Sequence, residues 1–129
     1  MFGISKKKPI VRTKDFVLTY DTKSNDWELV YKSIPFNFPK HDIHMPEVSE
    51  LDKYLSWVEI HSQHIQNCVK EMFDGYDEHI NISSSHVAQV SIEDPGYISV
   101  MVLGDDTWGD MGYDLWIKDG VIINEGAGD

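Results

Sequence analysis

Apolar and polar residues alternate in the first part of the chain, in the pattern of β-strands. The runs Phe16–Tyr20 and Trp27–Lys32 each place large apolar side chains at every second position. A polar cluster with turn residues separates the two runs, which predicts a β-hairpin. Pro35 and Pro39 follow. Because proline cannot donate a backbone hydrogen bond, we expect regular strand pairing to end here and Ile34–Met45 to form an extended crossing segment.

Between residues 46 and 74 the apolar spacing changes to three and four, which indicates one face of an amphipathic helix. Pro46 suits a first-turn position, and Gly75 suits a position just beyond the C-terminal end. The helix would be long, about seven or eight turns, with a break allowed near His61–Gln63. The apolar stripe consists of Val48, Leu51, Tyr54, Leu55, Val58, Ile65, Cys68, Val69, Met72 and Phe73.

The period returns to two in the last third of the chain. We expect four further strands, at Val87–Ile92, Tyr97–Leu103, Tyr113–Lys118 and Val121–Asn124. The prediction is therefore a single α+β domain over residues 1–129. It would hold a mostly antiparallel sheet of about five to six strands with one long amphipathic helix packed on it, in the order β-β-α-β-β-β-β.

Charge is distributed unevenly along the sequence. The net charge is −11; residues 1–40 carry eight basic and four acidic side chains, and residues 41–129 carry three basic and eighteen acidic ones. Such a field repels nucleic-acid phosphates, so we expect no nucleic-acid partner. It would attract a basic protein instead. The alternative is that the acidity only maintains solubility.

Composition points to a protein of the cytoplasm. No apolar run approaches the roughly 18 residues that a membrane-spanning helix needs, so we expect no membrane partner. The N-terminal lysines are not followed by the apolar stretch of a secretory signal. A single cysteine, Cys68, fits a reducing compartment.

The segment Gly104–Asp114 combines glycines, acidic residues and large apolar residues. We interpret it, with Trp116, as the surface that binds a basic protein partner, with the tryptophans and the methionine as apolar anchors. Two alternatives remain: a structural turn with Trp108 in the core, and a cation site, although the spacing differs from that of a calcium loop. The predicted partner-binding residues are Asp105, Asp106, Trp108, Asp110, Met111, Asp114 and Trp116.

Trp116 would be informative in a second way. It alternates with Leu115 and Ile117, so its side chain points to the opposite face of its strand. An open face would make this tryptophan part of a contact surface. A sheet covered on both faces would bury it.

Sequence motifs for metal binding and catalysis are absent. The six histidines show no His-Glu-x-x-His spacing, and Cys68 lies on the apolar stripe as a small buried side chain would. The run Ser83–His86 lacks a nucleophile-elbow motif, and the chain has no glycine-rich phosphate loop. We therefore predict no catalytic residue, metal or cofactor, and a protein that binds rather than catalyses.

The C-terminal third, from Trp108 to Ile122 with the final residues 125–129, resembles the ends of small bacterial domains such as the immunity proteins of polymorphic and contact-dependent toxin systems. The resemblance implies a cytosolic inhibitor that binds a toxin domain tightly, in many cases a nuclease with a basic active site. Two other functions stay open. One is a small metal-dependent hydrolase using the loop 104–114, and the other is an accessory domain that forms a homodimer through an exposed sheet edge.

Overall fold

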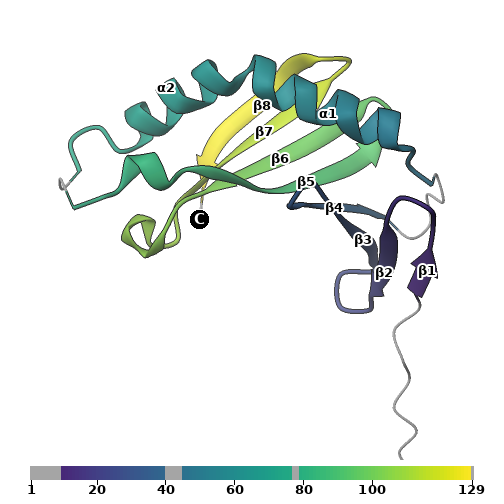
Figure 1. The fold of residues 1–129 in the computed structure, drawn as a ribbon. Coiled ribbons are helices and arrows are strands. Elements are labelled where there is room, and N and C mark those ends of the chain that lie inside the picture. The colour runs from purple at the N-terminus through teal and green to yellow at the C-terminus, as the bar shows by residue number, and fades with distance from the viewer. Residues whose placement is uncertain (1–9, 40–44, 77–78, 129) are drawn as a thin grey trace, which may run out of the picture.

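The computed structural model describes residues 10–39, 45–76 and 79–128. They form one eight-stranded sheet with two helices against one of its faces (Figure 1). The helices are α1 (Val48–Ile60) and α2 (Ser62–Met72), and two short 3-10 turns, η1 and η2, cover Ile82–Ser84 and Asp106–Trp108. The strands are β1 (Ile10–Arg12), β2 (Val17–Asp21), β3 (Asp26–Tyr31), β4 (Ile34–Pro39), β5 (His86–Asp94), β6 (Tyr97–Leu103), β7 (Gly112–Lys118) and β8 (Val121–Gly128).

Each strand pairs with the strand that follows it in sequence. All the pairs are antiparallel except β4 with β5, which is parallel and spans only Phe36–Asn37 and Val90–Ser91. A parallel pair needs a crossover connection, and α1 and α2 provide it. The fold is therefore two four-stranded meanders joined by a helical crossover.

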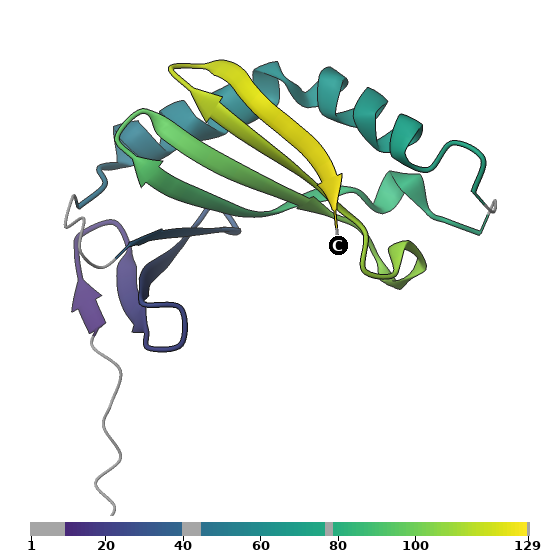
Figure 2. The same ribbon diagram turned by 180° about the vertical axis from the view of Figure 1, so that it is seen from behind.

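The sheet bends strongly at this parallel junction. Figures 1 and 2 show β5–β8 lying beneath both helices, whereas β1–β4 turn away from the plane of the other strands. Twist accumulates from strand to strand, and the two-residue pairing between β4 and β5 is the shortest ladder in the middle of the sheet. No described helix lies on the side of β5–β8 opposite α1 and α2.

The core lies between the helices and one face of the sheet. A continuous row of buried residues crosses five strands in register, from Leu29 on β3 to Leu115 on β7. The helices contribute their own buried side chains to the same cluster. The row is Leu29, Phe36, Val90, Val100 and Leu115, and the helical residues are Leu51, Tyr54, Ile65 and Val69.

The predicted fold class was wrong in its strand count. The six strands expected from alternation are present, but the sheet is mixed and has eight strands. β4 covers Ile34–Pro39, the first part of the segment in which regular pairing was expected to end, and residues 40–44 lie outside the described residues. Alternate residue pairs in an antiparallel ladder exchange no hydrogen bonds, so a proline can pair with β3 at such positions. Neither Pro35 nor Pro39 lies in the two-residue pairing with β5, so their missing backbone N–H donors are tolerated on that side as well. β1 has three residues, too few for a periodic pattern.

The prediction of one long helix was also wrong. α1 and α2 meet at His61, which ends the first helix and precedes the second. The His61 Nε2 atom donates a hydrogen bond to the Gly120 carbonyl oxygen at 2.8 Å, in the turn between β7 and β8. The break lets the helical layer follow the curved sheet, and it lies where polar residues interrupt the apolar stripe. Within the described residues, no helix is both long enough and apolar enough to cross a membrane.

Candidate functional site

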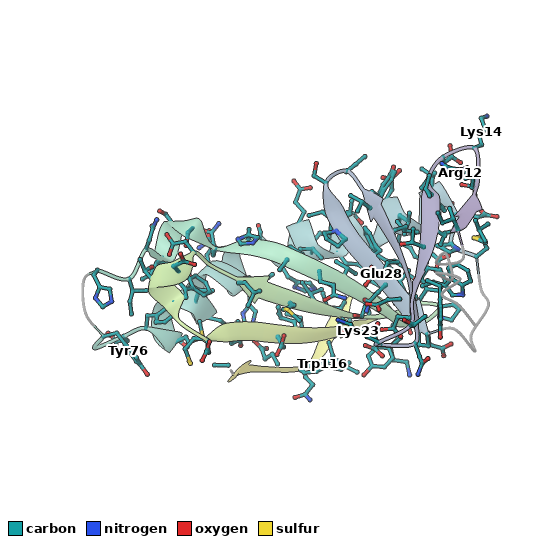
Figure 3. All side chains as sticks on the ribbon, turned by 90° about the horizontal axis from the view of Figure 1, so that it is seen from below. Arg12, Lys14, Lys23, Glu28, Tyr76 and Trp116 are labelled. Carbon is teal, nitrogen blue, oxygen red and sulfur yellow. The ribbon has the colours of Figure 1, made fainter. Side chains whose placement is uncertain are left out.

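The sheet face opposite the helices carries the first candidate site, which we call the outer face. Its side chains alternate with the core residues along β5–β8, and no helix of the described residues covers them (Figure 1). Figure 3 looks onto this face and labels Trp116. The outer face includes Gln89, Ser91, Glu93, Tyr97, Ser99, Met101, Asp114, Trp116, Lys118 and Asn124.

Trp116 lies at the centre of the outer face. Its neighbours in register are Ser99 on β6 and Asn124 on β8, both small or polar. Asp114 is two residues away on the same strand and therefore shares the face, beside Met101, which is 37% exposed. The indole is half-buried and lies outside the main core cluster. The outer face thus presents an aromatic and a thioether side chain next to a carboxylate.

Hydrogen bonds hold the polar part of this side of the sheet in place. Ser91 Oγ donates to Asn37 Oδ1 at 2.5 Å, across the parallel junction. Asn37 Nδ2 in turn donates to Asp26 Oδ2 at 3.2 Å. Ser99 Oγ donates to Glu93 Oε1 at 2.8 Å. These bonds fix three polar side chains of the outer face, Ser91, Glu93 and Ser99, the last of which is beside Trp116.

Trp108, by contrast, belongs to the core. Its side chain is 3% exposed, and its ring packs edge-on against that of Phe73, with the ring centroids 5.0 Å apart. Its Nε1 atom donates a hydrogen bond to the Asn81 carbonyl oxygen at 2.8 Å. Gly104 lies directly against the ring, where an added Cβ would come within 2.1 Å of Trp108 Cε2. The tryptophan therefore anchors the loop from inside, as the alternative reading of a structural turn expected.

The aspartates of the loop divide into two kinds. Asp105 caps η2: its Oδ1 atom accepts hydrogen bonds from Thr107 N at 3.0 Å and Thr107 Oγ1 at 2.5 Å, and Asn81 Nδ2 donates to its Oδ2 at 3.1 Å. These bonds, chiefly the one from the Thr107 side chain, lower the pKa of Asp105. Asp106 and Asp110 are exposed.

The structure therefore separates the predicted partner-binding residues by role. Asp114 and Trp116 lie on the outer face, and Asp106 and Asp110 are exposed in the loop that leads into β7. Asp105 and Trp108 are engaged in holding that loop. Met111 is half-buried against the core.

A second cluster lies on the helix side of the sheet and was not predicted. His64 and Cys68 are four residues apart on α2, so they share one helix face. Glu125 on β8 pairs with Leu115, and this register directs it toward the helices. His64 Nε2 donates to Glu125 Oε1 at 2.7 Å, and Cys68 Sγ lies 3.4 Å from His64 Nε2 and 3.5 Å from Glu125 Oε1. We call these three residues the His–Cys–Glu cluster.

Tyr113 on β7 is hydrogen-bonded to the cluster. Its hydroxyl donates to Glu125 Oε1 at 2.5 Å. The hydrogen bonds from Tyr113 and then His64 lower the pKa of Glu125. Burial is the main cause of a raised pKa at Cys68, so its sulfur is a thiol at neutral pH. A protonated thiol is a poor nucleophile, which argues against cysteine catalysis here.

Only part of this cluster can be predicted from the sequence. The His64–Cys68 spacing fits a helix face, but Glu125 lies 61 residues beyond His64, and only the pairing of β8 with β7 brings it back. His61 lies three residues before His64, but its side chain binds the Gly120 carbonyl instead. His41 and His44 lie outside the described residues.

The His–Cys–Glu cluster is the one grouping, among the residues that the structure describes, of three or more side chains placed to hold a metal ion together. None of the loop aspartates belongs to it.

Comparison of the chain with protein-family models, with curated proteins and with solved structures finds no match.

Proposed function

We propose that this chain is an acidic binding protein of the immunity type, which acts in the cytosol and neutralises a toxin domain by covering a basic surface on it. The binding surface would combine the outer face with Asp106 and Asp110 of the adjoining loop. The observation that carries the proposal is the position of Trp116, half-buried on a sheet face that no described helix covers. Tryptophan in such positions is enriched among the residues that dominate binding energy.

Charge supports a basic partner. The net charge of −11 attracts a positive protein over long range, and residues 41–129, which include the outer face of β5–β8 and the loop, hold most of the acidic side chains. Asp110 precedes Asp114 by four residues, so the loop and the outer face continue into one another along the chain. Lys118 is the basic member of the outer face, at one end of β7.

The loop offers little support for the alternative function, a metal-dependent hydrolase. Asp105 already accepts hydrogen bonds from Thr107 and Asn81 through both of its oxygens. The loop aspartates join no group of three potential ligands within the described part of the chain. A catalytic metal site would need such a group together with an open coordination position.

The proposal is tested with the gene beside the one that encodes this chain. We expect that gene to encode a larger protein whose C-terminal domain is toxic when expressed alone. Co-expression of this chain should restore growth, and Trp116→Ala should weaken the protection. Ile60→Ala is the matched control, because Ile60 is a 73% exposed apolar residue on α1, on the opposite side of the sheet.

Two results would contradict the proposal. One is a neighbouring gene whose product is not toxic, or whose toxicity this chain does not relieve. The other is protection that Trp116→Ala and Ile60→Ala reduce equally, since the outer face would then have no special role.

A homodimer is a second candidate, favoured by β8. Among the described strands it pairs with β7 alone, and its exposed residues include Val121 and Ile123, at 62% and 53%. An exposed edge strand can pair with another copy of itself. Sedimentation should then show a dimer that Ile123→Lys dissociates; a monomer at all concentrations would eliminate this candidate.

A further inference from the structure

We propose that His64, Cys68 and Glu125 bind one zinc ion between α2 and β8. This inference is independent of the proposed function, because the cluster lies on the helix side of the sheet and the outer face on the other. The three residues come from two separate elements, and their ligand atoms all lie within 4.8 Å of one another.

The spacing of the ligand atoms matches tetrahedral zinc at two of three edges. Zinc bonds of about 2.3 Å to sulfur and about 2.0 Å to nitrogen or oxygen place sulfur about 3.5 Å from each lighter ligand. Cys68 Sγ lies 3.4 Å from His64 Nε2 and 3.5 Å from Glu125 Oε1. The third edge, His64 Nε2 to Glu125 Oε1, is 2.7 Å and would open to about 3.3 Å around the ion. A side-chain movement of roughly half an ångström is enough.

The donor set selects zinc among common cations. Thiolate sulfur and imidazole nitrogen suit zinc and other late first-row metals, whereas magnesium and calcium prefer oxygen ligands. The ligands would bind as a thiolate, a neutral imidazole and a carboxylate, so the ion must displace the protons of Cys68 and His64. Side chains of His64 and Glu125 are 46% and 31% exposed, which leaves the ion a path from solvent and a water in the fourth position.

The surroundings hold the ligands as metal sites require. The helical spacing fixes His64 and Cys68 relative to each other, and the β7–β8 ladder fixes Glu125. Tyr113 donates to Glu125 Oε1 at 2.5 Å and thereby orients the carboxylate. Outer partners of this kind typically contribute about 10- to 100-fold to metal affinity. Tyr113 is therefore a positioning residue of the site.

The simpler alternative is that the cluster only ties α2 to β8 by hydrogen bonds. That role would need no thiol, because His64 and Tyr113 already bind Glu125. The two readings predict different behaviour of Cys68, since a zinc ligand must become a thiolate and a bystander remains a thiol. Cys68 is the only cysteine in the chain, so any thiolate signal comes from it.

The experiment is a titration of the purified full chain with zinc against a competing chelator, and a parallel titration with cobalt(II). We expect one ion per chain and, with cobalt, a sulfur-to-metal charge-transfer band in the near ultraviolet. Cys68→Ser should abolish the band, and His64→Ala and Glu125→Gln should each weaken binding more than Tyr113→Phe, which should cost about 10-fold. His86→Ala is the matched control, because His86 is exposed on β5, away from the cluster.

A second measurement uses the unmodified chain, in case a variant fails to fold. One equivalent of zinc should protect Cys68 from alkylation, and a chelator should restore its reactivity. The proposal is overturned if zinc leaves the alkylation rate of the unmodified chain unchanged. It is equally overturned if folded Cys68→Ser binds zinc as tightly as the unmodified chain, because the ion would then occupy other residues such as His41 and His44.

Discussion

Two tryptophans in the C-terminal third differ in environment although each lies two residues after an aspartate. Trp108 fills the core under the loop, whereas Trp116 lies on the outer face. Strand alternation predicted the direction of Trp116 relative to Leu115. It could not place Trp108, because a loop has no period, and both interpretations of that residue stayed open until its contacts with Phe73 and Asn81 were known.

We expect Trp108→Ala to lower the free energy of unfolding by about 3–5 kcal/mol, the range for truncating a large buried aromatic side chain. Trp116→Ala should cost less than half as much, because its indole is only half-buried. Urea denaturation of both variants gives the comparison. Equal losses would mean that Trp116 is a structural residue rather than a surface one.

Asp105 should make stability depend on pH at the acidic end. Its pKa in the folded protein is lowered by the hydrogen bonds from Thr107 and Asn81, so its stabilising contribution is present above the unfolded value of about 3.9 and is lost as the pH falls through the folded value. The difference in unfolding free energy between the unmodified chain and Asp105→Asn should therefore shrink below about pH 4. Urea denaturation at neutral and acidic pH measures it, with Asp106→Asn as the exposed control. A constant difference would contradict the capping role.

At the scale of elements, alternation predicted six strands but not β1 or β4. The three residues of β1 are too few to show an alternating pattern. Proline generally disfavours a strand, but the register of β4 with β3 tolerates its two prolines. The helix break at His61 lies where the sequence allowed one, at the interruption of the apolar stripe, and His61 also binds a turn 59 residues away. The His–Cys–Glu cluster, by contrast, depends on a long-range strand register. Features set by such distant contacts cannot be obtained from local periodicity.

Asp119-Gly120 is a favoured sequence for a two-residue hairpin turn, and the β7–β8 hairpin forms there, with φ of 50° and 84° at the two residues. Gly120→Ala should lower the free energy of unfolding by about 1–2 kcal/mol, the cost of a side chain in the left-handed region. Gly126→Ala is the control, because an added Cβ there meets no atom within 4 Å. Chemical denaturation should show a loss for the first variant alone; a tolerated Gly120→Ala would contradict the turn geometry.

At the scale of the whole molecule, the two sides of the sheet have separate tasks. The helix side holds the core and the His–Cys–Glu cluster, and the outer face is the side that we propose for contact with a partner. The net charge of −11 could be counted from the sequence, but which carboxylates are exposed could not. Asp105 and Glu125 are exposed but engaged in internal hydrogen bonds, whereas no internal hydrogen bond is shown for the exposed Asp106 and Asp110 side chains among the described residues.

Association kinetics test the central claim most directly. The association rate with the toxic domain encoded by the neighbouring gene should fall as ionic strength rises, because attraction between exposed charges is screened. The double variant Asp106→Lys/Asp110→Lys should associate more slowly and lose most of this salt dependence. The control Asp15→Lys/Glu59→Lys makes the same change in net charge at exposed positions in the β1–β2 turn and on α1, and it should keep most of the dependence. If both double variants change the rate and its salt dependence equally, or neither does, the loop and outer face are not the recognition surface.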